Sequence, residues 1–271
     1  MHDVQNEHDD RGIAIDEVGI SDLRYPLVFD DGHIRQQAIA DITLTVGLQA
    51  DRRGTHMSRM IALVHDEIAT LTPEELPHTL KRGLTLLDAP SLTLTLTLPL
   101  ATAVTAPASN LTSWQTHDIT LTGHITPNHC TLSTSVTTHV TTLCPCSKTI
   151  SDYGAHNQRS HITLTITGNP DSPYPLPVHH IIHLLRNSGS APVIPLVKRP
   201  DERIITMDAY DHPLFVEDII RNISLTCRKQ NLTHQITAKN LESIHSHNAI
   251  ATITHTLQTP TNPFFTEPLP S

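Results

Sequence analysis

Alternation of leucine and threonine is the feature that most limits how this chain can fold. From Ser91 the sequence reads "SLTLTLTLPL", and "HITLTITG" from His161 repeats the pattern. Residues two apart in a strand point to the same face, so each segment has one apolar and one hydroxyl-bearing face. Such strands are typical of antiparallel sheets whose polar side meets water or another subunit. Further strands are expected in "QAIADITLTVGL", "HDITLTGHI", "CTLSTSVTTHV", "LTHQITAKN" and "NAIATITHTL", whereas "LRYPLVF" is short, interrupted by proline and the weakest candidate.

Helical periodicity occurs between these strands. The segment "THMSRMIALVHDEIATL" carries an apolar stripe at helical spacing. Thr72 opens "TPEE", which predicts an N-cap threonine, a proline in the first turn and a capping-box glutamate for a second helix ending near Leu87. A second pair of helices is expected in "LPVHHIIHLLRN" and "HPLFVEDIIRNISLTC".

The resulting order of elements indicates an α+β protein built from two tandem ββααββ units, with antiparallel sheets and paired helices on one face. We expect the first unit at residues 21–127 and the second at 128–258. Residues 1–20 and the proline-rich segment 259–271 are expected to form an N-terminal arm and a C-terminal tail. The duplication is one of element order and is not visible as a sequence repeat.

Composition narrows the class of function. The chain has 271 residues, of which 38% are hydrophobic, and a net charge of -9. This acidic balance argues against broad nucleic-acid binding but leaves room for a small anion in a locally basic pocket. The sequence contains no apolar run long enough to span a membrane, and its polar, acidic start is unlike a secretory or transit peptide. We therefore expect a cytoplasmic protein.

Two cysteines and a histidine lie close together in "TTLCPCSKTISDYGAHNQRSH", from Thr141 to His161. If this segment connects two paired strands, Cys144 and His156 meet at the base of the hairpin. Thiolate sulfur and imidazole nitrogen bind zinc and similar divalent ions, and a set of two or three ligands with an open position indicates catalysis. A pair of buried thiols beside a surface imidazole is the alternative. The four cysteines have no disulfide-framework spacing.

Several segments together resemble the GTP cyclohydrolase type IB family. They are, in chain order, "VGISDLRYPL", "DDGHIRQQAIAD", "GTHMSRM", "CPCSKTISDYGAHNQRSH", "KRPDER", "FVEDIIR" and "ESIHSHNAIA". The resemblance implies the tunnelling fold and a homo-oligomer, usually a tetramer, with sites at subunit boundaries. It implies a hydrolase acting on cyclic amidine C–N bonds, with one divalent ion (zinc, manganese or iron) per site. The reaction converts GTP to 7,8-dihydroneopterin triphosphate and formate and begins folate and pterin biosynthesis.

The resemblance also implies roles for individual residues. Cys144, His156 and Glu202 match the metal ligands, and Cys144 is also expected to be catalytic. Glu217 matches the residue that binds the guanine edge, and His247 matches a histidine suited to proton transfer. Further candidates for the site are Cys146, His56, Arg59, Lys148 and Arg159, and the cations that flank the ligands and suit a triphosphate are Lys148, Arg159, Lys198, Arg199 and Arg203.

Each assignment has a structural alternative. Glu217 and Arg221 could form an i,i+4 salt bridge, and "KRPDER" could be a solvated surface loop. His245 and His247 lie on an expected strand, where either of them could merely be exposed. His56 and Arg59 could serve only to cap a helix or lie on its surface.

Two other functions stay open from the sequence. One is a tunnelling-fold nitrile reductase, in which a cysteine attacks a nitrile and nicotinamide supplies hydride. The other is a non-catalytic metal-binding protein that uses the 20 histidines.

One departure from the pattern of the GTP cyclohydrolase type IB family is Asn248, which stands where many relatives are expected to have aspartate.

Overall fold

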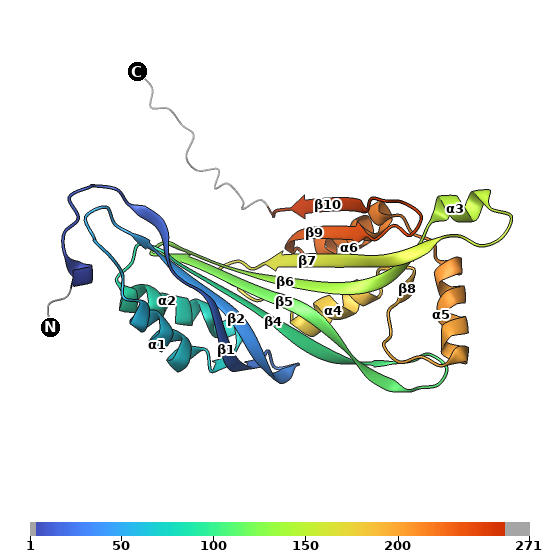
Figure 1. Ribbon diagram of the computed structural model, residues 1–271, viewed down its shortest axis with the longest axis horizontal. Coiled ribbons are helices and arrows are strands. Elements are labelled where there is room, and N and C mark those ends of the chain that lie inside the picture. Colours follow the sequence, from blue (N-terminus) through green and yellow to red (C-terminus); the bar gives the residue numbers. More distant parts are fainter. Residues whose placement is uncertain (1–3, 258–271) are drawn as a thin grey trace, which may run out of the picture.

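One ten-stranded sheet, with helices packed against it, forms the body of the protein (Figure 1). The computed structural model describes residues 4–257. The strands are β1 (Ile15–Asp30), β2 (Arg35–Leu48), β3 (Thr70–Leu71), β4 (Leu92–Thr105), β5 (Thr112–Thr126), β6 (His129–Leu143), β7 (Asn157–Thr167), β8 (Ala191–Pro192), β9 (Thr233–Asn240) and β10 (Ala249–His255). The helices are α1 (Met57–Glu67), α2 (Leu76–Leu87), α3 (Pro145–Ile150), α4 (Val178–Arg186), α5 (Arg199–Asp211) and α6 (Val216–Lys229), with 3₁₀ turns at Val4–Asn6 and Pro73–Glu75.

The strands run in the order β10-β9-β7-β6-β5-β4-β2-β1-β3, and β8 pairs with β6. Every pairing is antiparallel except that of β1 with the two-residue β3. The expected α+β class with antiparallel pairing is therefore confirmed. Among residues 4–257, none of the helices has the length and apolar character needed to cross a bilayer.

The alternating segments form strands as the sequence predicts. In β4 the side chains of Leu92, Leu94, Leu96 and Leu98 are buried, while the threonines between them are more exposed. The hydroxyl face is held by cross-strand hydrogen bonds, such as Ser135 to Thr165 at 2.9 Å and Thr137 to Thr163 at 2.8 Å. The period of two thus separates a packed face from a hydrogen-bonded one.

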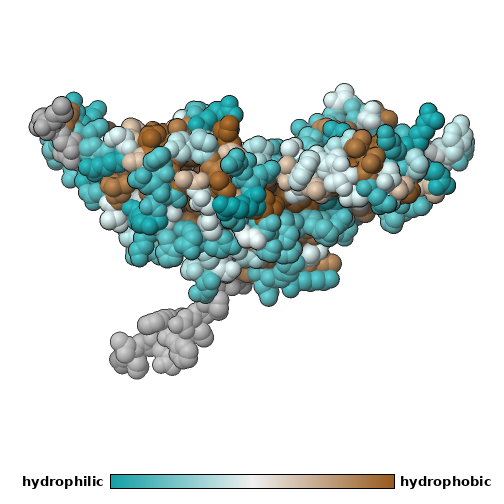
Figure 2. Space-filling model, turned by 90° about the horizontal axis from the view of Figure 1, so that it is seen from below, coloured by the Kyte–Doolittle hydropathy of each residue, from teal (hydrophilic) through white to brown (hydrophobic). Residues whose placement is uncertain are grey.

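The apolar strand face and the inner faces of the helices form a single core. It contains Met60 of α1, Leu80 of α2, Ile181 of α4 and Ile223 of α6. Gly123 in β5 lets α2 approach, because a Cβ atom there would lie 2.6 Å from a methyl carbon of Leu80. The surface in Figure 2 is mostly hydrophilic, with separate hydrophobic patches.

The first pair of expected helices is present as α1 and α2, and α2 ends at Leu87 as predicted. The predicted capping box at Thr72 is wrong. A 3₁₀ turn (Pro73–Glu75) separates Thr72 from α2, and the threonine side chain makes no capping hydrogen bond. The capping box requires the threonine to precede the helix directly, and the turn prevents this.

Two further expectations need correction. β1 has 16 residues and includes Pro26, which pairs with Ile39 of β2. On its other side β1 pairs with β3 only through Val28 and Phe29, so Pro26 occupies an edge position, where proline is tolerated. The charged run from Lys198 leads into α5 and is not simply a surface loop.

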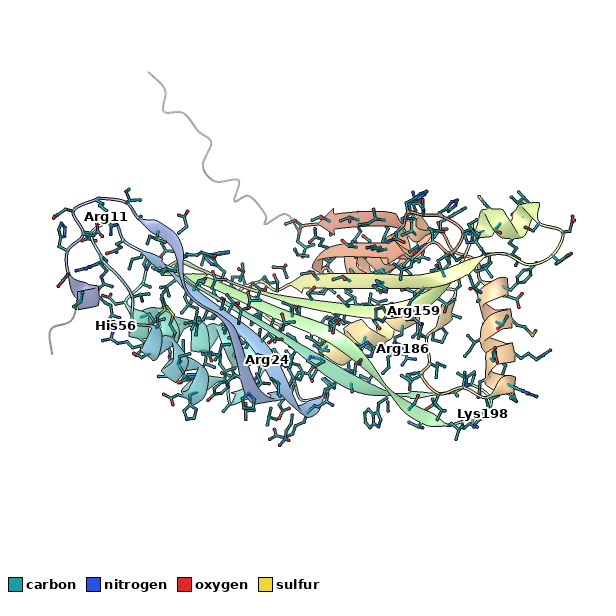
Figure 3. The ribbon with its side chains drawn as sticks, in the orientation of Figure 1. Arg11, Arg24, His56, Arg159, Arg186 and Lys198 are labelled. Carbon is teal, nitrogen blue, oxygen red and sulfur yellow. The ribbon has the colours of Figure 1, made fainter. Side chains whose placement is uncertain are left out.

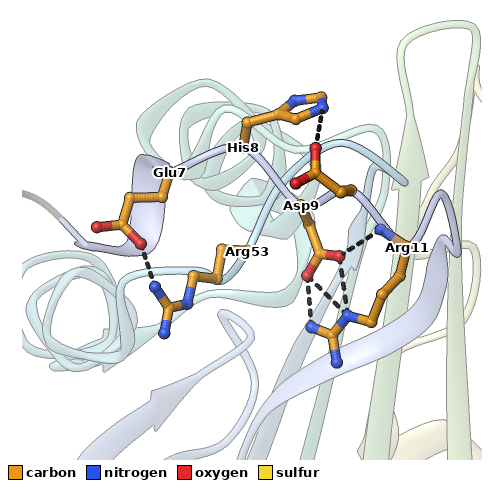
Figure 4. A network of polar contacts seen from close by, with 6 residues as sticks. Glu7, His8, Asp9, Arg11 and Arg53 are labelled. Atoms are coloured by element: carbon orange, nitrogen blue, oxygen red, sulfur yellow. Dashed lines mark hydrogen bonds and ion pairs between the residues drawn. The ribbon is translucent and has the colours of Figure 1, made fainter.

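Residues near the N-terminus are fixed to the loop before α1. The Glu7 carboxylate pairs with the Arg53 guanidinium, and the Asp9 carboxylate pairs with Arg11 (Figure 4). The backbone N–H of Asp9 also donates to the carbonyl of Asp51 at 2.9 Å. β1 begins at Ile15, inside the segment expected as an arm, and the expected tail at 259–271 lies outside the described residues.

Candidate active site

The cysteine loop connects β6 to β7, as expected. Leu143 pairs with Asn157, and the next pair brings the backbone N–H of Cys144 to the carbonyl of His156 at 3.1 Å. The loop between them contains α3 and lies at the opposite end of the molecule from α1 and α2 (Figure 1). The sheet therefore places the thiol and the imidazole on neighbouring strand ends, although 12 positions separate them in sequence.

Local hydrogen bonds fix this pair. Cys144 is the N-cap of α3, and its Sγ atom accepts a hydrogen bond from the backbone N–H of Ser147 at 3.5 Å. The Ser147 hydroxyl in turn accepts from the backbone N–H of His156 at 3.2 Å. Pro145 occupies the first turn of α3, where a proline costs no hydrogen bond. Ser147 therefore joins the two proposed ligands.

The orientation of the His156 ring follows from its neighbours. The side-chain amide of Gln158 donates through Nε2 to the Thr142 hydroxyl at 3.0 Å, which turns its Oε1 towards His156. That oxygen lies 2.9 Å from His156 Nδ1, so Nδ1 donates and carries the proton. Nε2 of His156 is then left with a lone pair. A histidine held in this way is ready to bind a metal ion.

A carboxylate and two more imidazoles come from the loop between β9 and β10. Glu242 Oε2 lies 4.0 Å from His156 Nδ1. The His245 ring meets His156 edge-on with 6.5 Å between centroids, and His247 stacks on His245 at 5.0 Å. The expectation that His245 and His247 lie on a strand is wrong, because β10 begins only at Ala249. Glu242 was missed, although it opens the "ESIHSHNAIA" segment.

Glu202 lies on α5 and lines a cavity of about 320 Å³ together with Gln158 and Arg159. Its neighbour Asp201 anchors this helix. The buried Asp201 carboxylate accepts hydrogen bonds from the backbone N–H groups of Ala108, Ser109 and Lys198 and from the Ser109 hydroxyl. Burial raises the pKa of Asp201, but these donors outweigh it and hold the pKa well below its usual range.

The structure brings together two of the three proposed metal ligands. Cys144 and His156 are neighbours, whereas Glu202 reaches only the cavity that Gln158 also lines. Within the described range, no group of three or more histidine, cysteine or acidic side chains already gathers its donor atoms around one point. A thiol and an imidazole on neighbouring strand ends are nevertheless donor types that suit zinc, manganese or iron.

The candidate cations differ in how freely they can contact a ligand. The Lys148 ammonium donates to the carbonyl of Tyr210 at 2.5 Å and lies 4.2 Å from the centre of that ring. Arg159 is exposed and lines the cavity with Glu202, and Lys198 is exposed at the start of α5 (Figure 3). Cys146 is exposed on α3.

One of the expected blocks, "GTHMSRM", lies away from this pair within one chain. His56 is the N-cap of α1, and the Arg59 guanidinium donates to the carbonyl of Leu86 at 3.4 Å. Figure 3 shows His56 beside α1 and Arg159 in the opposite half of the molecule. A site that uses both blocks therefore requires two copies of the chain.

Glu217 is exposed in the first turn of α6. The salt bridge considered for it is absent from the described structure, because Arg221 pairs with Asp218 at 3.8 Å instead. Asp218 also accepts a hydrogen bond from the backbone N–H of Phe215 at 3.0 Å, so it is Asp218 that caps the helix. The Glu217 carboxylate is thus left available for a ligand.

Comparisons with solved structures agree with the fold. Uricase from Arthrobacter globiformis matches with a TM-score of 0.54 and 9% identity, covering 91% of this chain and 96% of that one. At this identity the likeness concerns the fold alone, and it is consistent with the tunnelling fold.

Comparisons of sequence identify the family. The family model described as type I GTP cyclohydrolase folE2 matches residues 1–251. The protein named GTP cyclohydrolase FolE2 from Neisseria gonorrhoeae is 37% identical over 255 residues, covering 93% of this chain and 98% of that protein. The protein of the same name from Dichelobacter nodosus is 40% identical over 256 residues, covering 93% of this chain and 97% of that protein. The chain therefore belongs to the type I GTP cyclohydrolase FolE2 family.

Proposed function

We propose that this chain hydrolyses GTP to 7,8-dihydroneopterin triphosphate with release of formate, the first step of folate and pterin biosynthesis. Membership of the FolE2 family supports the reaction. The structural observation that carries the proposal is the backbone pairing of Cys144 with His156, whose ring is held through Nδ1 by Gln158. The reaction class suits such a site, because opening the imidazole ring of GTP at C8 is a hydrolysis at an amidine-like carbon.

We assign one divalent ion per active site to Cys144, His156 and Glu202. Such an ion supplies Lewis acidity and lowers the pKa of a water molecule towards neutrality. Asp201 supports the assignment of Glu202, because its four hydrogen bonds fix the start of α5 at the edge of the cavity that Gln158 shares. Glu242 stands beside His156 and supports the orientation of its ring.

The substrate roles follow from exposure and chemistry. Glu217 is free to accept two hydrogen bonds from a ring N–H and an exocyclic amine of guanine. We assign proton transfer to His247, which stacks on His245 and through it reaches His156. Arg159 and Lys198 are the exposed cations best suited to the triphosphate, whereas Lys148 would first have to leave Tyr210. Cys146 keeps no separate role in this assignment.

We further propose that the chain works in the cytoplasm as a homo-oligomer, a tetramer, with sites at subunit boundaries. The separation of α1, which carries Arg59 and begins after His56, from α3, which begins after Cys144, supports this, because a second copy would be needed to bring the two blocks together. We also propose that residues 21–127 and 128–258 are tandem ββααββ units. The order of elements supports this division, since β5 ends at Thr126 and β6 begins at His129.

Turnover after metal removal tests the function. The protein is stripped with a chelator, one metal at a time is restored, and formate and the fluorescence of oxidised pterin are measured with GTP as substrate. We expect turnover to return with at least one of zinc, manganese and iron. The matched variant Cys146→Ser should respond like the parent chain, whereas Cys144→Ser should stay inactive with every metal. GTP turnover that survives complete removal of metal would overturn the metal assignment.

A further inference from the structure

Arg186, the last residue of α4, is a cation that has no counter-ion among residues 4–257. Its Nε atom is buried and has no hydrogen-bond partner, and no ion pair or hydrogen bond joins its guanidinium to another residue of the described chain. Burial lowers the pKa of Arg186, and no nearby acid opposes the effect. A guanidinium nevertheless stays charged in proteins, so half-burying it without a partner costs free energy.

Arg186 acts electrostatically on a buried histidine, His117, which is neutral. His117 of β5 is almost fully buried, and its two ring nitrogens lie 2.9 Å and 2.8 Å from the hydroxyls of Thr102 and Thr138. Burial, and after it the charge of Arg186, lowers the pKa of His117 to about 4. His117 is therefore uncharged at neutral pH and adds no second positive charge beside Arg186, but it supplies no negative charge either.

Arg186 opens into a cavity of about 890 Å³ between α4, α5 and α6. His183, one turn before the end of α4, and Asn187, which follows it, also line the cavity, and the Asn187 side-chain amide lies 3.1 Å from His183 Nε2. Asp208 and Asp211 line the α5 side, but neither forms an ion pair with Arg186. None of the residues in the seven segments that carry the family resemblance lines this cavity.

We propose that this cavity binds a small anion, with a single phosphate or carboxylate group held by the planar fork of the Arg186 guanidinium. Arginine pairs with both groups through two parallel N–H bonds, which would satisfy the buried Nε and one terminal nitrogen. The two aspartates on the opposite wall disfavour a polyanion, so the triphosphate of GTP is a poor match. A singly anionic ligand with a hydrogen-bond donor at its far end fits both walls.

The site adjoins the proposed active site without being part of it. Ser190 and Leu214 line the cavity, and both contact Leu143: the Ser190 hydroxyl accepts from the Leu143 N–H at 3.1 Å, and the Leu214 N–H donates to the Leu143 carbonyl at 3.1 Å. Leu143 immediately precedes Cys144. The proposal itself does not depend on the GTP reaction, and its test uses no turnover.

Thermal unfolding of the full-length protein in chloride buffer of constant ionic strength, with added inorganic phosphate or acetate, tests the proposal. We expect at least one anion to raise the Tm in a saturable way, because a ligand that binds only the folded state stabilises it. Arg186→Met removes the charge but keeps an apolar chain. It should unfold at a higher temperature than the parent protein without anion and lose the response to the anion.

A matched control separates this site from general charge effects. Arg82→Met removes one cation from α2, where Arg82 pairs with Glu67, and should keep the full anion response. Arg186→Lys keeps the charge but lacks the planar fork of the guanidinium. This variant should need at least a several-fold higher anion concentration for the same rise in Tm. An equal anion response in the parent and Arg186→Met, or no saturable binding by isothermal titration with either anion, would overturn the proposal. Dissociation of the oligomer in Arg186→Met would also overturn it, since the missing partner would then be a carboxylate of a second copy.

Discussion

The strand pairs β1–β2 and β6–β7, one in each half of the chain, are both antiparallel, but the connections between their strands differ. In the N-terminal half, β1 and β2 join through a short turn in which the Asp31 carboxylate accepts from the backbone N–H groups of His33 and Ile34, at 3.1 and 2.7 Å. In the C-terminal half, β6 and β7 join through α3, with Cys144 and His156 at the base. The comparison teaches that an antiparallel strand pair can be closed by a short structural turn or by a longer loop that carries candidate ligands, called the chemical loop below.

The same contrast appears after the first helix of each half. α1 is followed closely by α2, whereas α4 is separated from α6 by β8 and α5. The helix α5 carries Glu202, and its first turn is tied by Asp201 to Ser109, in the turn between β4 and β5. The additions in the C-terminal half thus supply the candidate ligands, while the N-terminal half supplies the anchor.

The largest expected effect concerns the chemical loop. Cys144→Ser should reduce formate release from GTP more than about 100-fold, because loss of an outer-shell partner alone costs about 10- to 100-fold and this residue is assigned as a direct ligand. The unfolding midpoint should change little. Cys146→Ser is the matched control, and similar losses in both variants would show that the loop tolerates no change of thiol, whichever residue binds metal.

The core should respond alike in both halves. Leu80→Ala in α2 and Ile223→Ala in α6 each remove a fully buried side chain and should lower the free energy of unfolding by about 2–5 kcal/mol. Denaturant unfolding measures both. The exposed Leu86 and Leu225 give matched controls, whose replacement by alanine should cost far less. A small loss for only one core variant would mean that the halves do not share one core.

Disrupting the structural turn between β1 and β2 should lower the stability of the fold without lowering the rate of GTP turnover. The buried Asp31 also accepts hydrogen bonds from the Tyr174 hydroxyl at 2.9 Å and the Val178 N–H at 3.2 Å, which joins the turn to the start of α4. Asp31→Asn should cost about 1–3 kcal/mol, because an amide cannot accept all four bonds. Urea unfolding gives the stability, and formate release per folded protein should stay unchanged. A strong loss of turnover would contradict the contrast between the two connections.

The buried His117 should lower the free energy of unfolding in acid. The pKa of His117 is lowered to about 4 in the folded protein, by burial first and then by Arg186, against an ordinary value near 6.5. Between these values the unfolded chain binds a proton that the folded chain does not, so the free energy of unfolding falls as pH drops from about 6.5 to about 4. Urea midpoints at several pH values, with chelator present, measure the slope. His117→Gln should flatten it, and an unchanged slope would exclude His117 as a cause.

The smallest effect belongs to the hydroxyl face of the sheet. Thr137→Val removes one partner of the 2.8 Å hydrogen bond to Thr163 but keeps a β-branched side chain. The loss should be about 1 kcal/mol or less, because such cross-strand pairs contribute little individually. Thr137 and Thr163 replaced together should cost less than the sum of the single changes, which a double-mutant cycle measures.

The sequence predicts the strands well because their signal is local. Period-two alternation in β4 and β7 needs only neighbouring residues, and the helix stripes of α1 and α6 need only a few turns. The helix α5 is different, since its first turn depends on Ala108 and Ser109, more than 90 residues away. Propensity could not predict that contact.

The same limit applies to the candidate site. Cys144 and His156 could be paired from the sequence, because one hairpin joins them. Glu242 approaches His156 only through the pairing of β7 with β9, which no spacing reveals. The stacking of His245 and His247 depends likewise on a loop conformation, and the expectation of a strand there failed for that reason.

X-ray absorption at the metal edge of the reconstituted protein tests the central assignment most directly. The account predicts one sulfur ligand at about 2.3 Å and at least one imidazole nitrogen at about 2.0–2.1 Å in the parent chain. In Cys144→Ser the sulfur contribution should vanish, and in His156→Gln the imidazole contribution should decrease. Spectra with the same sulfur shell in the parent and Cys144→Ser would contradict the claim that this thiol binds the metal.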